Sequence, residues 1–156
     1  QGTPLLGQLF VFFFGLPLIG IQVDAWTAAA LSLSIYAAAF FGEIWRGALQ
    51  SVSIRQWEAG ASLGLRYGQR LFYVVLPQAL RVAVAPTVGF LVQLVKNTSL
   101  TALIGFVELT RAGQIISGAT FAPLRVYLVV AVVYFVICFS LSQMSRRLER
   151  KLHVAR

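Results

Sequence analysis

The sequence predicts an all-α, polytopic membrane protein with about four membrane-spanning helices and one short cytoplasmic helix. Two observations lead to this fold class. Of the 156 residues, 58% are hydrophobic and 12% are charged, whereas a soluble domain is about half apolar and roughly a quarter charged. Uncharged residues also gather in long runs, of which the clearest are residues 1–23, 25–42, 82–95 and 126–145. Because a helix needs about 20 apolar residues to cross a bilayer, a soluble enzyme with one large core is excluded.

The basic residues predict which side of the membrane each loop faces. The chain has 13 Lys and Arg against 5 Asp and Glu, a formal net charge of +8, and most of the excess lies in residues 43–81 and 146–156. Cytoplasmic loops of membrane proteins concentrate Lys and Arg in this way, so both segments are expected in the cytoplasm. A nucleic-acid partner is excluded, because it would need basic residues interleaved with aromatic ones on a solvated face, and these basic residues adjoin predicted spans.

The first two spans follow from the uncharged runs. The first is expected over residues 5–21, where Pro17 ends or kinks the helix because it lacks an amide proton. Asp24 marks a short turn outside the membrane, and the second span is expected over residues 25–44. That span is rich in Ala, Gly and Ser. Small side chains let helices approach closely in a membrane, so this span is expected to pack against other helices.

A polar loop of about residues 46–77 follows. Ser53 and Gln56 form an S-x-x-Q capping box, which predicts a short helix starting near residue 54. Three glycines lie four residues apart in this stretch: Gly60, Gly64 and Gly68. The spacing would place them on one helix face, and glycine costs a helix about 1 kcal/mol relative to alanine, so a tightly packed partner is expected there. The alternative is a loosely ordered cytoplasmic loop.

The remaining elements are a broken span, an external loop and a final span. Leu76-Pro77 is expected to open the third span, because proline at the first helical position costs no hydrogen bond. Lys96 interrupts the uncharged run and predicts a broken or re-entrant helix. Residues 105–123 are expected to form an external loop with one short helix. Residues 124–144 form the last span, and the crossings then place both basic segments in the cytoplasm.

The polar loop resembles a pattern in the membrane subunits of bacterial ABC importers. That pattern is E-A-A, three residues, G, nine residues, I, one residue and L-P. The matching residues of this chain stand at the same offsets: Glu58, Ala59, Gly60, Gly64, Val74, Leu76 and Pro77. Gly60 replaces the second alanine of the pattern, and Val74 replaces its isoleucine. Four further segments look like the polar amino acid branch of these permeases: Gly2-Thr3-Pro4-Leu5-Leu6, Glu43-Ile44-Trp45-Arg46-Gly47, Leu76-Pro77-Gln78-Ala79-Leu80-Arg81 and Lys96-Asn97-Thr98-Ser99-Leu100.

The resemblance implies a type I ABC importer permease fold over the whole chain. Residues 1–156 would form a single ABC transporter transmembrane domain that lacks its amino-terminal part, because the Gly-Thr-Pro-Leu-Leu segment follows a first helix in that family. The implied function is ATP-driven import of polar amino acids across the bacterial cytoplasmic (inner) membrane. The implied partners are ABC ATPase subunits, a second permease subunit that is either a copy or a close relative, and an extracytoplasmic amino-acid-binding protein. ATP and Mg²⁺ would bind to the ATPase subunits, with no cofactor, metal or catalytic site on this chain.

The resemblance also implies a coupling helix that sits in a groove of the ATPase, within a coupling loop of about residues 46–77. The residues assigned to this role are Glu58, Ala59, Gly60, Gly64, Arg66, Leu76 and Pro77. The small residues among them would permit close seating, and Glu58, Arg66 and Arg70 would make polar contacts at the rim. Closure of the ATPases on ATP would then rock the spans and produce alternating access.

Ionisable residues at membrane depth are candidates for the substrate path, because burying them without a partner is costly. Lys96 stands at the expected helix break, where it would meet a substrate carboxylate. Three polar residues follow it and would hydrogen-bond around the substrate: Asn97, Thr98 and Ser99. In the alternative, Lys96 reaches the outer interface and its neighbours cap a helix. Glu43 would attract an ammonium group, or alternatively it pairs with Arg46, three residues on.

Two other classes of protein compete with this interpretation. An ATP-independent secondary carrier or channel for small polar solutes would also need several spans, and it differs in having no ATPase partner. An intramembrane enzyme would need paired catalytic groups within the spans, and the sequence offers none.

Overall fold

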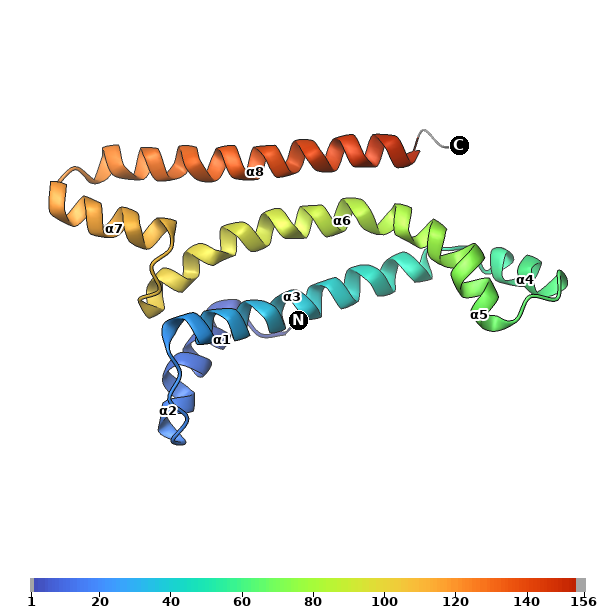
Figure 1. Cartoon of the computed structure of the whole chain (residues 1–156), viewed down its shortest axis with the longest axis horizontal. Coiled ribbons are helices and arrows are strands. Elements are labelled where there is room, and N and C mark those ends of the chain that lie inside the picture. Colours follow the sequence, from blue (N-terminus) through green and yellow to red (C-terminus); the bar gives the residue numbers. More distant parts are fainter. Residues whose placement is uncertain (1, 154–156) are drawn as a thin grey trace. The chain divides into compact units, whose positions relative to one another are not determined.

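The computed structural model describes residues 2–153, and their side chains up to residue 150 (Figure 1). Every regular element among these residues is helical. The α-helices are α1 (Leu5–Phe10), α2 (Leu16–Leu18), α3 (Ala25–Gln50), α4 (Ile54–Ser62), α5 (Tyr67–Arg70), α6 (Leu76–Asn97), α7 (Leu109–Thr120) and α8 (Pro123–His153). The π-helical turns Val11–Gly15 and Leu71–Val75 and the 3₁₀ segment Thr98–Ile104 adjoin them. Residues 154–156, the end of the expected basic tail, lie outside the described residues.

Among the described residues, three helices are long and apolar enough to cross a membrane. They cover Ala25–Gln50, Tyr67–Ile104 and Pro123–Arg150. The first expected span is the shorter apolar helix Leu5–Leu18, which ends because Ile19 leaves helical geometry and Gly20 takes a positive φ of 87°. The all-α, polytopic prediction is confirmed, although one of the four expected spans is shorter than a full crossing needs.

The chain divides into two compact units. The first unit comprises Gln1–Ala39 and Leu91–Leu141, and the second comprises Phe40–Phe90 and Ser142–Arg156. The core of the first unit is a cluster of buried apolar residues: Leu5, Leu9, Ala28, Ala29 and Ile104. Small residues at the start of α3 therefore pack against other helical segments, as the sequence predicts for this span.

The core of the second unit joins the end of α3 to the first half of α6. Ala48 of α3 is buried against Ala79 and Ala83 of α6. Trp45, Leu49 and Val52 pack against this cluster. Alanine at the contact lets two helix backbones come close together, so this cluster fixes where α6 lies on α3 within the unit.

The helix α6 begins at Leu76, as predicted for Leu76-Pro77, but the chain is already helical before it. The longer helical stretch begins at Tyr67 and continues through the π-helical turn Leu71–Val75 into α6. Proline inside a helix removes a backbone hydrogen bond, and its ring crowds the carbonyl of the preceding turn. The π-helical turn directly precedes Leu76 and Pro77, and the side chain of Gln78 donates a 2.8 Å hydrogen bond to the carbonyl of Val74. The helix therefore accommodates the proline without ending.

A change of helix type stands where the sequence predicts a break after Lys96. The α-helix α6 ends at Asn97, a 3₁₀ segment follows, and Gly105 ends that segment with a φ of 84°. Hydroxyl groups satisfy carbonyls at this junction: Thr98 Oγ1 donates to the Val95 carbonyl and Ser99 Oγ to the Lys96 carbonyl, both at 2.7 Å.

The short helix expected in residues 105–123 is α7, and Glu108 caps its first turn. The Glu108 carboxylate accepts hydrogen bonds from the backbone amides of Thr110 (2.8 Å) and Arg111 (2.7 Å). Tyr134 of α8 donates a third hydrogen bond to the same carboxylate (2.9 Å). Glu108 therefore fixes the start of α7 and ties it to α8 within the first unit.

Candidate functional site

The candidate coupling site is a helical hairpin in the second unit, formed by α4, the turn after it and α5. We call residues 53–70 the coupling hairpin. Ser53 caps its first helix, because Ser53 Oγ accepts a 3.3 Å hydrogen bond from the amide of Arg55. The predicted helix start near residue 54 is confirmed. The Gln56 side chain of the expected capping box instead accepts a 3.5 Å contact from Gln78.

The predicted stripe of three glycines on one helix is wrong. The helix α4 ends at Ser62, and Gly64 lies in the turn with a φ of 74°. Two backbone hydrogen bonds close the turn, from the Gly64 amide to the Ala61 carbonyl (2.9 Å) and from the Leu65 amide to the Gly60 carbonyl (3.1 Å). This is the Schellman arrangement, which favours glycine because other residues rarely adopt a positive φ. Gly64 is therefore required for its backbone conformation.

Gly60 and Gly68 lie on different helices of the hairpin. Gly60 belongs to α4 and is buried, whereas Gly68 belongs to α5 and is exposed. A β-carbon added at Gly60 would meet the side chain of Arg70, while one added at Gly68 would meet no atom of the described residues within 4 Å. Close packing in the hairpin is therefore concentrated at Gly60.

An aromatic pair and a cation hold α4 against α5. The rings of Trp57 and Tyr67 stack with centroids 5.4 Å apart and planes inclined by 26°. Arg70 Nη1 donates to the carbonyl oxygen of Trp57 at 3.4 Å. The Arg66 amide donates to the side chain of Gln69 (2.9 Å), which fixes the start of α5. The loosely ordered loop that was the alternative is therefore not what the structure shows.

The outer surface of the coupling hairpin combines polar and apolar side chains. Glu58, Ala59 and Arg66 are exposed. Two large apolar side chains are exposed beside them, Ile54 at 67% and Leu63 at 79% of their surface. Sequence reasoning missed these two residues; the signal was available, because both are large aliphatic residues in a loop too polar to cross the membrane. Exposed apolar groups rimmed by charged ones are typical of protein interaction sites.

Leu76 and Pro77 do not belong to the coupling hairpin; they lie in α6. They begin α6 after the π-helical turn, next to Val75, which is fully buried, and before the alanines that pack on α3. The structure therefore separates the seven predicted coupling residues into two groups. One group forms the coupling hairpin, and the other belongs to the helix that connects it to the span.

The substrate-path candidates divide between the two units. Glu43 lies in the second unit and pairs with Arg46, as the alternative prediction states: Arg46 Nε donates to Glu43 Oε2 at 3.0 Å, and a second contact joins Arg46 Nη2 to Glu43 Oε1. Arg46 also donates to Gln50 (3.0 Å). Both side chains of the ion pair are about half exposed, 58% for Arg46 and 48% for Glu43.

The second group of substrate-path candidates lies at the end of α6 in the first unit. Lys96 is exposed, and no carboxylate among the described residues pairs with it. The Asn97 side chain accepts a 3.1 Å hydrogen bond from Gln93. Thr98 and Ser99 donate their hydroxyl protons to backbone carbonyls, which leaves their oxygens as acceptors. The group therefore offers a substrate one cation and several acceptors.

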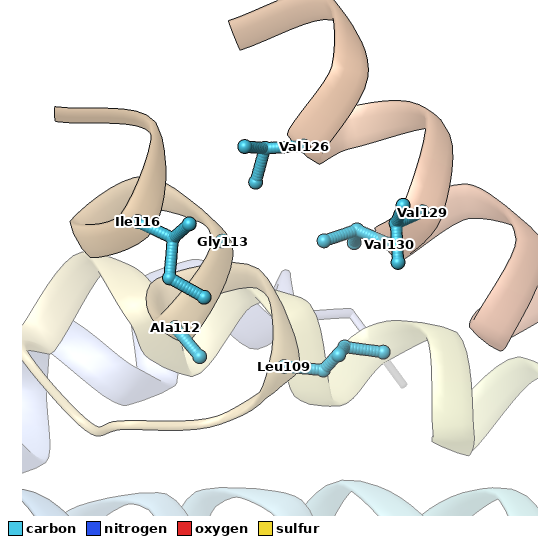
Figure 2. A pocket seen from close by; sticks show the side chains of 7 residues that line it. All are labelled: Leu109, Ala112, Gly113, Ile116, Val126, Val129 and Val130. Carbon is cyan, nitrogen blue, oxygen red and sulfur yellow. The ribbon is translucent and has the colours of Figure 1, made fainter. Parts of the chain in front are cut away.

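A pocket between α7 and α8 has a different chemistry. Figure 2 shows its lining, which is apolar throughout: Leu109, Ala112, Gly113, Ile116, Val126, Val129 and Val130. The two helices pack closely at Gly113, where an added β-carbon would stand 2.8 Å from Val130 Cγ2. Such a lining offers no partner for an amino or carboxylate group. Within residues 2–150, no three His, Cys, Asp or Glu side chains are grouped to hold a metal ion.

Comparisons with known proteins point to one family of membrane transport proteins. Residues 1–154 match the family described as binding-protein-dependent transport system inner membrane component. The probable amino-acid ABC transporter permease protein YckA of Bacillus subtilis is 40% identical over 151 residues, which cover 97% of this chain and 67% of the relative. The probable glutamine ABC transporter permease protein GlnP of the same organism is 43% identical over 154 residues, which cover 96% of this chain and 70% of the relative.

A relative from another organism and a solved structure give the same result. The glutamine transport system permease protein GlnP of Escherichia coli is 38% identical over 156 residues, which cover 99% of this chain and 71% of the relative. A crystal structure of an amino acid ABC transporter with histidines superposes with a TM-score of 0.91 at 33% identity, over 96% of this chain and 70% of that one. The chain thus spans roughly two thirds of the length of the proteins it resembles.

Proposed function

Since this chain belongs to the family of binding-protein-dependent transport system inner membrane components, we propose that it is the permease subunit of an ATP-driven importer of polar amino acids. The observation that carries the proposal is the similarity to amino-acid permeases along almost the whole chain, in sequence and in fold. The subunit moves its substrate across the bacterial cytoplasmic membrane and contains no catalytic site of its own. ATP and Mg²⁺ bind to separate ATPase subunits.

The coupling hairpin is the surface on which an ATPase subunit sits. Its exposed residues suit a protein interface. Leu63 and Ile54 offer apolar contact area, and Glu58 and Arg66 offer charges at the rim. A protein interface of this kind takes most of its binding energy from a few well-packed apolar groups, while rim charges contribute specificity. The short side chain of Ala59 lets another protein approach the exposed face of α4 closely.

The continuous helix from Tyr67 to Ile104 transmits the motion of the ATPase to the membrane. Closure of the ATPases on ATP moves α4, and α4 is held on α5 by the Trp57–Tyr67 stack. Because α5 continues into α6 without a break, displacement of the hairpin becomes displacement of the span. Alternating access follows when this span and its counterparts in the second permease subunit rock together.

The substrate passes the end of α6. Lys96 attracts the carboxylate of the amino acid, and the acceptors of Asn97, Thr98 and Ser99 take hydrogen bonds from its amino and side-chain groups. Two observations support that assignment: Lys96 is exposed with no carboxylate partner among the described residues, and the chain changes from α to 3₁₀ helix at this point. Broken helices in transporters present polar groups to substrates. Glu43 contributes less to substrate binding, because Arg46 already neutralises its charge.

The orientation of the chain follows from its basic residues. The coupling hairpin holds Arg55, Arg66 and Arg70, and the end of α8 holds a further group: Arg146, Arg147 and Arg150. Concentrated positive charge marks the cytoplasmic side, so both face the ATPase. A second permease subunit, identical or related, pairs with this one in the bilayer, and an extracytoplasmic binding protein delivers the amino acid from the other side.

The proposal is tested by reconstituting the full-length permease in proteoliposomes with its cognate ATPase and binding protein. A panel of basic, acidic and amide amino acids is offered, and ATP hydrolysis and uptake are measured together. We expect at least one polar amino acid to stimulate hydrolysis and to accumulate only with ATP. Uptake that proceeds equally well without the ATPase subunit contradicts the proposal and supports an ATP-independent carrier.

A further inference from the structure

Gly60 lies directly under the side chain of Arg70. A β-carbon built on Gly60 would stand 2.9 Å from Arg70 Cγ and 3.2 Å from Cδ, closer than nonbonded carbon atoms approach without repulsion. Gly60 is buried and lies in the last turn of α4, still within the helix, where alanine has the higher helix propensity. The stem of Arg70 therefore occupies the space that an alanine methyl group would need.

Arg70 has little freedom to move away from Gly60. The position of its Cγ is set by χ1, so a shift of Cγ requires a different side-chain rotamer. In its present rotamer, Arg70 Nη1 reaches the carbonyl of Trp57 at 3.4 Å. Arg70 Nε is buried and has no acceptor among the described residues. Within the part of the chain that the structure describes, one long hydrogen bond and no ion pair hold this guanidinium, so packing of the stem on Gly60 defines its place.

We infer that Gly60 and Arg70 are a matched pair that sets the position of α4 on the helix leading into α6, and that Arg70 is thereby a positioning residue for coupling. The inference rests on the proposed function, because it concerns how motion of the hairpin reaches the span. It also explains the departure from the E-A-A pattern. Glycine replaces the second alanine here because Arg70 fills the volume of the missing methyl group.

The test is a double-mutant cycle in the reconstituted complex, with amino acid imported per ATP hydrolysed as the measured quantity. Gly60→Ala restores the pattern residue, yet overpacking predicts a loss of roughly fivefold in this ratio. Arg70→Ala removes the stem and also lowers the ratio. In the double variant the alanine methyl fills the vacated space, so the ratio recovers above that of either single variant.

Two control variants separate packing from other effects. Gly118→Ala lies in α7, outside the coupling hairpin, where the new β-carbon meets no described atom within 4 Å, and it should leave the ratio unchanged. Arg70→Met keeps an unbranched stem over Gly60 without the charge, and it should retain most of the ratio. If Gly60→Ala behaves like Gly118→Ala, or if the losses of the two single variants simply multiply in the double variant, the matched pair is refuted.

A second measurement distinguishes failure of the pair from failure of the proposed function. Amide hydrogen exchange over residues 54–70 is measured on the purified full-length permease, without ATPase or substrate. Exchange should rise in Gly60→Ala and return toward the parent level in the double variant. If the parent complex imports no amino acid with ATP, the proposed function fails, whereas the exchange cycle still decides whether the pair exists. Equal exchange in all variants refutes the pair even when transport is intact.

Discussion

Tyr134 and Glu108 are joined by a 2.9 Å hydrogen bond between residues 26 positions apart, which ties the first turn of α7 to α8. The Glu108 carboxylate is also the N-cap of α7 and accepts two backbone amides. Thr110 Oγ1 lies 3.2 Å from the same tyrosine hydroxyl. The Tyr134 hydroxyl and the amides of Thr110 and Arg111 all donate to the Glu108 carboxylate. Glu108 therefore has a structural role in this fold and offers little to a passing ammonium group.

Tyr134→Phe tests this link. The variant removes one donor while the two backbone amides still satisfy the carboxylate, so we expect a destabilisation of about 1 kcal/mol, typical for a lost hydrogen bond. Thermal unfolding of the purified permease in detergent measures it. Tyr127→Phe, on the same helix, is the control, because no hydrogen bond of its hydroxyl is seen among the described residues. Equal shifts for both variants would show that the Glu108 contact contributes nothing.

Gly64 provides a prediction about backbone conformation. At a φ of 74°, Gly64→Ala should destabilise the coupling hairpin by about 1 kcal/mol, whereas Gly64→Asn should cost less, because asparagine tolerates the left-handed region. Amide exchange of residues 54–70 reports the change directly. The added β-carbon meets no described atom within 4 Å, so size is not the cause. A larger loss with asparagine than with alanine would contradict the conformational explanation.

Lys96 and Glu43 should respond differently to neutralisation. Lys96→Gln should reduce amino acid uptake per inserted complex by about tenfold, the loss of roughly one charge-assisted hydrogen bond. Glu43→Gln should leave uptake close to normal and change stability little, as expected for an exposed ion pair. Arg125→Gln, which removes another exposed cation of the first unit, is the control for Lys96. Normal uptake by Lys96→Gln would remove Lys96 from the substrate path.

Asp24 gives the start of α3 a dependence on pH. Hydrogen bonding from Thr27 lowers the pKa of Asp24 below its ordinary value of 3.8, and the Thr27 amide donates to Asp24 Oδ1 at 3.2 Å. A carboxyl group whose pKa is lower in the folded state stabilises the fold above its unfolded pKa, and the contribution is lost as the pH falls through the folded pKa. Amide exchange in the first turn of α3 should therefore increase, relative to Asp24→Asn, as the pH is lowered from about 5 to about 2. Identical pH profiles for the two proteins would contradict this role.

Several features of the fold could be predicted from local sequence alone. Uncharged runs of sufficient length identify membrane helices, because the cost of burying charge in lipid applies residue by residue. Ser53 predicts the start of α4, since an N-cap needs one side chain and the next few amides. The spacing of the pattern residues from Glu58 to Pro77 indicates the family, because that pattern also lies within one short stretch of sequence. Each of these signals is contained within a few turns of the chain.

Other features depend on residues that meet only in the folded chain. Spacing suggested one glycine face, but the turn at Gly64 ends α4 first, and the glycines then serve different purposes. Pro77 suggested a helix start, but a π-helical turn and the Gln78 side chain accommodate it inside a longer helix. Whether a proline ends a helix depends on whether neighbouring backbone and side-chain groups replace the lost hydrogen bond. The helix propensities of single residues do not include this effect.

The sequence by itself determined the class of protein, three long apolar helices and the start of the coupling hairpin, because hydropathy, charge and capping act over short distances along the chain. Tertiary structure alone decided that Arg70 lies over Gly60 and that Tyr134 reaches Glu108. Those contacts depend on where separate helices place their side chains. That placement is set by the packing of whole elements, which short-range patterns do not specify.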